Sequence, residues 1–356
     1  MQTENRYHSC ALHDAALQLF RASGSPEEEA ALLARLLTDA SLSGAESHGL
    51  SRIPQYLGRL RNGIVKAGQQ PEITVDRGCA ALISGNHGYG QVMANFAISQ
   101  AIERTAKHGM SVVGLVEVGH IGRLGDFASM AAEAGLVCLV FASSGGVSRW
   151  MAPFNGKQAR MGTNPMAAAF PSDRAHPVVF DFAASAVANG KIQTWTKNGQ
   201  PAPEGVLIDA DGNPTTDPNV VGNGGAILPL GGPEGGHKGF GIAFMVEVLS
   251  GILTVGAFSG GPDAKTTNNV TTFVTIDAGI FRAVSDFKED LNRFIGFLKD
   301  TPAQAGKEIR IPGETSGRTR AERMRDGIPL SETIVAGIQA ELDAYGVDVD
   351  LRGLTV

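Results

Sequence analysis

Two apolar runs bounded by glycines, at residues 110–118 and 136–142, constrain the fold more than any other part of the sequence. Runs of this length are typical of buried strands, and the small-residue segment between them is typical of a crossover helix. The stretch therefore predicts a β-α-β unit, with His120 on the turn that leaves the first strand. Because α/β proteins place their chemistry at the carboxyl ends of parallel strands, His120 is the best catalytic candidate in the chain.

Periodicity along the rest of the chain predicts helices at both ends and an α/β body between them. Residues 1–76 are predicted to be helical, and a last helix is predicted at about 331–345. The body is predicted to contain strands at 80–83, 166–170, 178–182 and 270–276, and helices at 93–108 and 281–298. A tract rich in Gly, Pro, Asn and Asp, residues 198–225, is predicted to hold a turn or hairpin at 209–213.

Composition limits the classes of partner. The 356 residues are enough for two or more domains, and the formal net charge of −6 argues against a nucleic-acid or membrane surface. The longest apolar stretch, residues 239–258, is interrupted by Glu247 and by glycines, so we expect a buried helix and no membrane span. The three cysteines are far apart in apolar surroundings, which predicts buried free thiols. With a polar, acidic amino-terminal segment that does not resemble a signal peptide, they indicate a cytoplasmic protein.

The common cofactor and metal motifs are missing from this sequence. There is no Gly-x-Gly-x-x-Gly between a strand and a helix, no Walker A loop and no Cys-x-x-Cys pair. The acidic tract at 209–213 lacks the spaced ligands of a calcium loop, so no metal site is predicted.

The candidate site residues that remain are scattered along the chain. Ser47, His48 and Arg52 lie together where a helix is predicted to begin, and a guanidinium there could bind a carboxylate in bidentate fashion. Taken singly, each candidate could equally be a capping, turn or surface residue. Their combination favours a site.

The motifs that contain these residues resemble, in the same order, those of the malate/L-lactate dehydrogenase family that lacks a Rossmann fold. The similar motifs cover nearly the whole chain: Ser47-His48-Gly49 followed by Arg52, Gly119-His120, Gly162-Thr163-Asn164-Pro165, Phe180-Asp181-Phe182-Ala183, Thr215-Thr216-Asp217-Pro218, His237-Lys238-Gly239 and Ile311-Pro312-Gly313-Glu314. One such motif would be weak, but seven in order are specific. The resemblance implies a non-Rossmann α/β NAD(P)-binding fold whose N- and C-terminal helices pack together.

The resemblance also implies an activity and an assembly. The expected reaction is the NAD(P)-dependent interconversion of a 2-oxo acid and a malate- or lactate-like 2-hydroxy acid. The alternative substrates are cyclic 2-imino acids such as pyrroline- or piperideine-2-carboxylate, and a non-catalytic binding protein is the alternative of another class. NAD and NADP are both candidate cofactors, and a homodimer is expected. The predicted domains are a helical one (1–76 with 315–356), an α/β one (77–118 with 240–314) and a cofactor-binding one (119–239).

Residue roles follow from the same resemblance. His48 and His120 are the two candidates for the residue that moves the proton. The predicted substrate-binding residues are Ser47, Arg52, Tyr56, Thr163 and Asn164. The predicted cofactor-binding residues are His120, Ser144, Asp181, Phe182, Ala183, Lys238, Gly313 and Glu314.

The sequence departs from the family pattern in two places that bear on the substrate. Gly119 stands where the family often has asparagine before the histidine. Gly145 follows Ser144 where some members carry an acidic residue, and the loop beyond it is longer and holds Arg149 and Trp150. Both substrate classes therefore stay open from the sequence.

Overall fold

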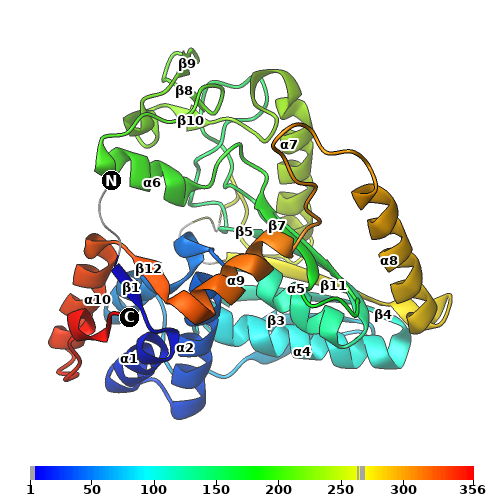
Figure 1. Cartoon of the computed structure of the whole chain (residues 1–356), viewed down its shortest axis with the longest axis horizontal. Helices are drawn as coiled ribbons and strands as arrows, with labels where there is room; N and C mark the ends of the chain where they lie inside the picture. Colours follow the sequence, from blue (N-terminus) through cyan, green and yellow to red (C-terminus); the bar gives the residue numbers. More distant parts are fainter. Residues whose placement is uncertain (1–4, 263, 265–268) are drawn as a thin grey trace.

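The computed structural model describes residues 5–262, 264 and 269–356, and its central element is a seven-stranded mixed sheet (Figure 1). The strand order is β2-β3-β4-β11-β5-β6-β7. The strands are β2 (Glu72–Asp76), β3 (Ala80–Ser84), β4 (Met110–Val118), β5 (Leu136–Ser143), β6 (Pro165–Phe170), β7 (Val178–Ala183) and β11 (Asn269–Asp277). The predicted α/β class is confirmed.

The β-α-β unit is present, but a strand from much later in the chain separates its two strands. Helix α5 (Leu124–Glu133) connects β4 to β5, which run in the same direction because β11 is antiparallel to both. Phe273 of β11 pairs with Val113 on one side and Val140 on the other. An apolar run indicates that a strand will be buried, but it does not specify which strands will pair with it in the sheet. The position of β11 between β4 and β5 could therefore not be predicted.

Helices cover both faces of this sheet. On one face, α4 (Gly90–His108) and α5 pack their small and apolar side chains into the main core. On the other face lie α7 (Gly232–Glu247) and a π-helical turn (Val248–Ile252). The apolar stretch at 239–258 is therefore only partly buried: Ala243 and Val246 face the sheet, whereas Phe244 and Leu253 are exposed.

The two ends of the chain form a second core (lower left of Figure 1). It is built from α1 (Ser9–Ala22), α2 (Glu27–Leu42), α3 (Ile53–Arg61) and α10 (Glu332–Ala344). Strand β1 (Asn5–Tyr7) pairs with β12 (Ile328–Leu330) and ties the ends together. The packing of the N- and C-terminal helices is thus as predicted. Helices α1, α2 and α3 confirm the helical character predicted for residues 1–76, but two strands, β1 and β2, also lie in this range and were not predicted.

The remaining elements surround the sheet. A small sheet of order β10-β8-β9 contains the turn predicted at 209–213, where the Asp209 amide donates to the Asn213 carbonyl. Helices α6 and α9 were not predicted. The bounds are β8 (Leu207–Ile208), β9 (Pro214–Thr215), β10 (Ala226–Ile227), α6 (Asn189–Asn198), α8 (Val284–Lys299) and α9 (Glu314–Asp326).

The structure also bears on the predictions for the cysteines, the domains and a membrane span. The cysteines are all free, but only Cys138 is buried, so the prediction of burial is wrong for Cys10 and Cys79. The strands of the two predicted α/β domains share one sheet, with β3, β4 and β11 of the first followed by β5, β6 and β7 of the second, so a boundary between those domains would cut the sheet between β11 and β5. The division into domains stays a prediction. No helix in the described part of the chain has the length and apolar character needed to cross a membrane. A cytoplasmic location stays a prediction.

Candidate active site

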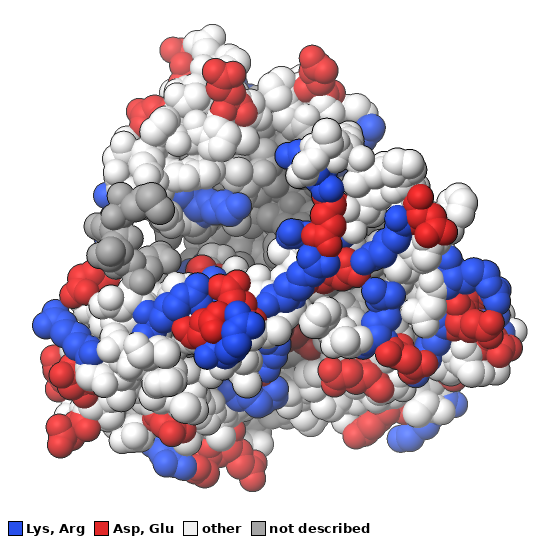
Figure 2. All heavy atoms as spheres, viewed as in Figure 1, with Lys and Arg blue, Asp and Glu red and all other residues white. Residues whose placement is uncertain are grey.

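A cavity of about 1020 Å³ opens at the edge of the sheet where β4, β5 and β7 end and β6 and β11 begin. The hollow is visible in the face shown in Figure 2, with basic side chains along its rim. Its opposite wall comes from the segment between α2 and α3 and from the start of α9. Cavities of several hundred Å³ hold small-molecule ligands, so this cleft is large enough for an extended cofactor together with a small acid.

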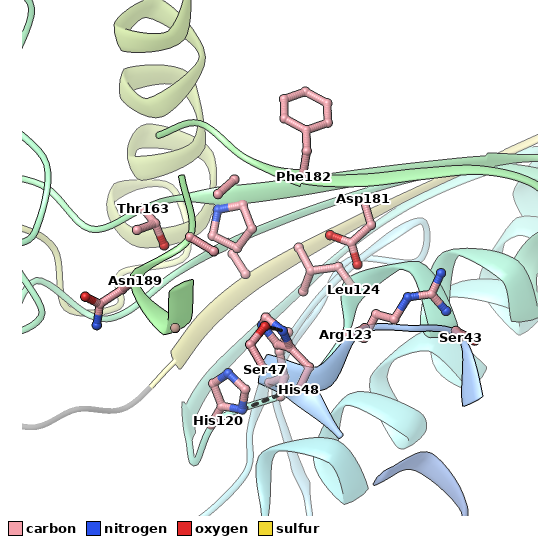
Figure 3. Close-up of a pocket in the computed structure, with 18 of the residues that line it drawn as sticks. Ser43, Ser47, His48, His120, Arg123, Leu124, Thr163, Asp181, Phe182 and Asn189 are labelled. Carbon is pink, nitrogen blue, oxygen red and sulfur yellow. Dashed lines mark hydrogen bonds between the residues drawn. The ribbon is translucent and has the colours of Figure 1, made fainter. Parts of the chain in front are cut away.

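The two candidate histidines meet in this cleft although 72 positions separate them. His48 ends the short 3-10 helix Glu46–His48, and His120 lies on the turn after β4. Their rings stack with centroids 5.4 Å apart and an interplanar angle of 28°. In Figure 3 both lie on one side of the cleft, with Thr163 and Phe182 on the other. Ser47 Oγ is 2.9 Å from His48 Nδ1, so the two side chains form a hydrogen bond.

A distortion at the end of β4 sets the position of His120. The pairing of β4 with β11 shifts register near its end, and Glu117 adopts a φ of +55°. Such bulges redirect the chain at the end of a strand. Asn269 then fixes the turn: its Oδ1 accepts from the Ile121 amide at 2.9 Å, and its Nδ2 donates to the Ser143 carbonyl at 3.1 Å. Asn269 also lines the cleft, and the sequence offered no signal for it.

Burial and nearby cations keep both imidazoles neutral. Desolvation, with the charges of Arg52 and Arg123, lowers the pKa of His48 to about 4. Desolvation, Arg52 and His48 lower the pKa of His120 well below its usual value of 6.5. In the absence of ligand, each ring is therefore in the form that can accept a proton at pH 7. An anion bound beside Arg52 would offset the positive charge and raise both pKa values.

Tyr56 lies behind His120 and does not line the cleft. Its hydroxyl is 2.9 Å from His120 Nδ1 and 3.3 Å from the His120 carbonyl oxygen. The Gly122 amide also donates to Nδ1, at 3.3 Å, so in this arrangement Nδ1 carries the lone pair and the neutral ring carries its proton on Nε2. The expectation that Tyr56 joins Arg52 at a substrate carboxylate does not match this geometry, because helix α3 turns the tyrosine into the protein interior, where it is only 3% exposed.

We expect Tyr56→Phe to lower kcat about five- to tenfold and to leave KM for the acid within about twofold. The variant keeps the ring and removes one hydrogen bond to the imidazole, a loss of about 1 kcal/mol that acts on the orientation of His120. Steady-state kinetics provide the measurement. A large rise in KM with unchanged kcat would instead support direct contact between Tyr56 and the substrate.

Positive charge dominates the described lining of the cleft. Arg52, Arg59, Arg123 and Arg310 line it, whereas Asp181 is the one carboxylate among the described lining residues. Arg52 donates from Nε to the Ser47 carbonyl and from Nη1 to Gln55 Oε1 at 2.7 Å. Its Nη2 has no hydrogen-bond partner among the described residues. The cleft therefore suits an anionic ligand.

Most of the residues predicted to bind the cofactor line the same cleft: Ser144, Asp181, Phe182, Ala183 and Gly313. Asp181 Oδ2 accepts from the Gly125 amide at 2.8 Å, at the start of α5. Burial raises the pKa of Asp181, opposed by this hydrogen bond and by Arg123.

Lys238 and Glu314 are placed elsewhere. Helix α7 begins six residues before Lys238, at Gly232, and the lysine is exposed outside the cleft lining. Glu314 is buried and turned away from the cleft: its carboxylate contacts Lys299 at 2.5 Å and Arg174 at 3.0 Å. Neither residue touches the cleft that holds the other predicted cofactor residues.

The loop that departs from the family pattern contributes Trp150 to the cleft, whereas Arg149 is exposed and donates to the Gly146 carbonyl at 3.1 Å. Thr163 and Asn164 line the cleft as predicted residues of the site. Several lining residues were not predicted: Ser43, Arg59, Arg123, Asn189, Asn269, Arg310, Thr315 and Thr319. No group of three or more His, Cys, Asp or Glu side chains in the described part of the chain could hold a metal ion.

Comparison with known proteins agrees with this architecture. The sequence profile of malate/L-lactate dehydrogenase matches residues 8–339. The chain belongs to the malate/L-lactate dehydrogenase family. Hydroxycarboxylate dehydrogenase B of Escherichia coli O157:H7 is 36% identical over 338 residues, which are 93% of this chain and 91% of that protein.

Solved structures of family members superpose closely. Malate dehydrogenase from Pyrococcus horikoshii OT3 has a TM-score of 0.88 and 32% identity, over 98% of each chain. Δ1-piperideine-2-carboxylate reductase from Pseudomonas syringae pvar. tomato has a TM-score of 0.80 and 29% identity, over 94% of this chain and 99% of that one. This member of the malate/L-lactate dehydrogenase family is therefore an oxidoreductase, and its fold is the family's. A dehydrogenase family of this kind implies a nicotinamide cofactor.

Proposed function

We propose that this enzyme interconverts a 2-hydroxy acid and a 2-oxo acid with NAD or NADP, in the cleft that contains His48, Arg52 and His120. The observation that carries the proposal is the stacked pair of neutral histidines beside a guanidinium. A carboxylate binder next to a proton acceptor is what oxidation of a 2-hydroxy acid requires. The names of the relatives, which include hydroxycarboxylate and malate dehydrogenases, support the same substrate class.

The described residues fit a nicotinamide cofactor. The arginines of the cleft can neutralise a diphosphate, and Asn164 presents a buried oxygen without a partner, as described below. When bound, the cofactor would supply the hydride chemistry at the carbon that carries the hydroxyl or oxo group.

The chain's own residues carry the other steps. Arg52 binds the substrate carboxylate and so brings the hydroxyl to the histidines. The histidine nearest that hydroxyl takes its proton at the ring nitrogen that carries the lone pair, and in the reverse direction it returns the proton to the carbonyl oxygen. Tyr56 holds the Nδ1 side of His120. The carboxylate next to Arg52 raises the histidine pKa values, which prepares the protonated form needed for reduction.

The direct test is a panel of 2-oxo acids and cyclic 2-imino acids, each with NADH and with NADPH, followed by the absorbance of the reduced nicotinamide. We expect turnover with 2-oxo acids. Turnover confined to cyclic imines would favour the second candidate function, which the similarity to the piperideine-2-carboxylate reductase supports. Cofactor binding without turnover of any substrate would indicate a non-catalytic binding protein.

We also propose that the protein is a homodimer. The apolar faces of the terminal helices pack into a core of their own within one chain. Exposed apolar side chains lie on α7, at the end of the π-helical turn and directly after it: Phe244 is 59%, Ile252 50% and Leu253 57% exposed. Contiguous exposed apolar surface is typical of a protein interface, so this surface is the better candidate.

We expect the protein to sediment as a dimer at micromolar concentration and Leu253→Asp to sediment as a monomer. The new charge would have to be desolvated in the interface. Met324→Asp is the matched control, because Met324 is also 59% exposed but lies on α9. A dimer that survives Leu253→Asp and dissociates with Met324→Asp would place the interface at the terminal helices.

A further inference from the structure

Asn164 carries an unsatisfied oxygen in the wall of the cleft. The residue is 1% exposed, and its Oδ1 has no hydrogen-bond partner among the described residues. Its Nδ2 donates to the Ala243 carbonyl at 2.9 Å and to Glu247 Oε2 at 2.7 Å. Both partners are acceptors, so only the amide NH₂ group can face them, and Oδ1 must point the other way. A buried acceptor without a donor is rare in proteins and calls for a ligand that supplies one.

The free oxygen borders a space that glycine keeps open. A Cβ placed on Gly162 would lie 2.8 Å from Asn164 Oδ1 and 3.0 Å from Ser144 Oγ. These three residues all line the cleft. Asn164 Oδ1 and Ser144 Oγ therefore border the same part of the cleft, one as an acceptor and the other as a hydroxyl donor. The hydroxyl donates to the Ser148 carbonyl at 3.4 Å, a long contact that it can exchange for a ligand oxygen.

Glu247 fixes this arrangement from behind. It is 7% exposed, does not line the cleft, and uses its second oxygen to accept from the Ser259 amide at 2.6 Å. It is the last residue of α7, where the helix widens into the π-helical turn. Widened turns of this kind are frequent at functional sites. With one oxygen held by Ser259 and the other by Asn164, the carboxylate has little freedom to release the amide.

We propose that Glu247 is a positioning residue that holds the Asn164 oxygen toward the cleft as the acceptor for an N–H of the nicotinamide carboxamide, with Ser144 Oγ donating to the carboxamide oxygen. The inference rests on the proposed function and assigns Asn164 to the cofactor instead of the substrate. A carboxamide offers an N–H and a C=O side by side, which match these two groups. A 2-oxo acid has no such donor, and the hydroxyl of a 2-hydroxy acid belongs at the histidines.

The test compares three ligands by isothermal titration calorimetry: the oxidised cofactor, its 3-acetylpyridine analogue and ADP-ribose. The analogue carries a methyl group where the carboxamide has NH₂, and ADP-ribose lacks the ring. We expect the wild type to bind the cofactor about five- to tenfold more tightly than the analogue, the effect of one hydrogen bond to an otherwise unpaired acceptor. The cofactor used, with its 3-acetylpyridine analogue, is whichever of NAD and NADP binds more tightly to the wild type.

Glu247→Gln should reduce this preference to less than about twofold. With its oxygen held by the Ser259 amide, the glutamine would turn its NH₂ toward the NH₂ of Asn164, and two donors cannot hydrogen-bond to each other. The asparagine amide then loses one of the two acceptors that fix its orientation and keeps only the Ala243 carbonyl. The affinity for ADP-ribose should stay within twofold, which shows that the cleft is intact. Glu29→Gln is the matched control: Glu29 is 6% exposed and also accepts from a backbone amide, that of Gly68, and the control should keep the wild-type preference.

Each outcome bears on the proposal. Equal affinity of the wild type for the cofactor and the analogue would overturn it without any variant. A full preference retained by Glu247→Gln would remove Glu247 from the role. If neither the dinucleotides nor ADP-ribose bind at all, the proposed function fails, and this inference fails with it.

Discussion

Of the two variants His48→Ala and His120→Ala, the one that removes the proton-transferring histidine is expected to lower kcat by roughly 10²–10⁴-fold. This is the usual contribution of general acid–base catalysis. The other variant should show a smaller loss, because its ring only stacks on the working imidazole and shapes the cleft. KM should change less than kcat in both, since neither ring is proposed to bind the carboxylate.

The pH profile identifies the working histidine. For oxidation of a 2-hydroxy acid the imidazole must be neutral, so kcat/KM should rise with pH through the histidine pKa of the free enzyme. Because burial and Arg52 lower both pKa values, this rise should lie below pH 6.5. The alanine variant that lacks the true base should lose the rise. Two variants that both keep it, with near-wild-type kcat, would show that neither histidine carries the proton.

Arg52→Ala is expected to raise KM for the acid strongly. The loss of binding free energy should be about 2–5 kcal/mol if the ion pair between Arg52 and the carboxylate is desolvated. The interaction is present in the ground state and the transition state alike, so kcat should fall much less. Arg52→Lys should recover only part of the affinity, because an ammonium group cannot present the planar fork of a guanidinium.

The same residue links substrate binding to proton affinity. Removing the Arg52 charge should raise the pKa of both histidines, so the rise of kcat/KM should move to higher pH in Arg52→Ala and stay in place in Arg52→Lys. The exposed Arg293 on α8 provides a control, and Arg293→Ala should leave KM and the profile unchanged. An Arg52→Ala variant with wild-type KM would place the carboxylate elsewhere in the cleft.

Much of the candidate site was predictable because its residues stand at points of local change in the sequence. His120 follows an apolar run and a glycine, and Ser47, His48 and Arg52 interrupt a helical pattern. Seven short motifs in order were enough to indicate the family, which the comparisons confirm. The assignment of individual roles to these residues stays a prediction.

Other residues could not be placed from the chain, because their neighbours are set by contacts between distant segments. Tyr56 shares a helix face with Arg52, yet the packing of α3 against the turn after β4 directs its hydroxyl to His120. Lys238 and Glu314 lie in motifs of the family, but the start of α7 exposes the first, and ion pairs with Lys299 and Arg174 hold the second away from the cleft.

Local sequence alone determined which segments are apolar, the strands and helices of the α/β body from β3 to β7, and where polar residues follow them, since these depend on side chains within a few positions. The tertiary structure decided that β11 inserts between β4 and β5, that Asn269 ties the turn of His120 to the end of β5, and that Glu247 faces Asn164 across 83 positions. These arrangements depend on strand pairing and on the satisfaction of buried polar groups, and both are settled only when remote parts of the chain meet.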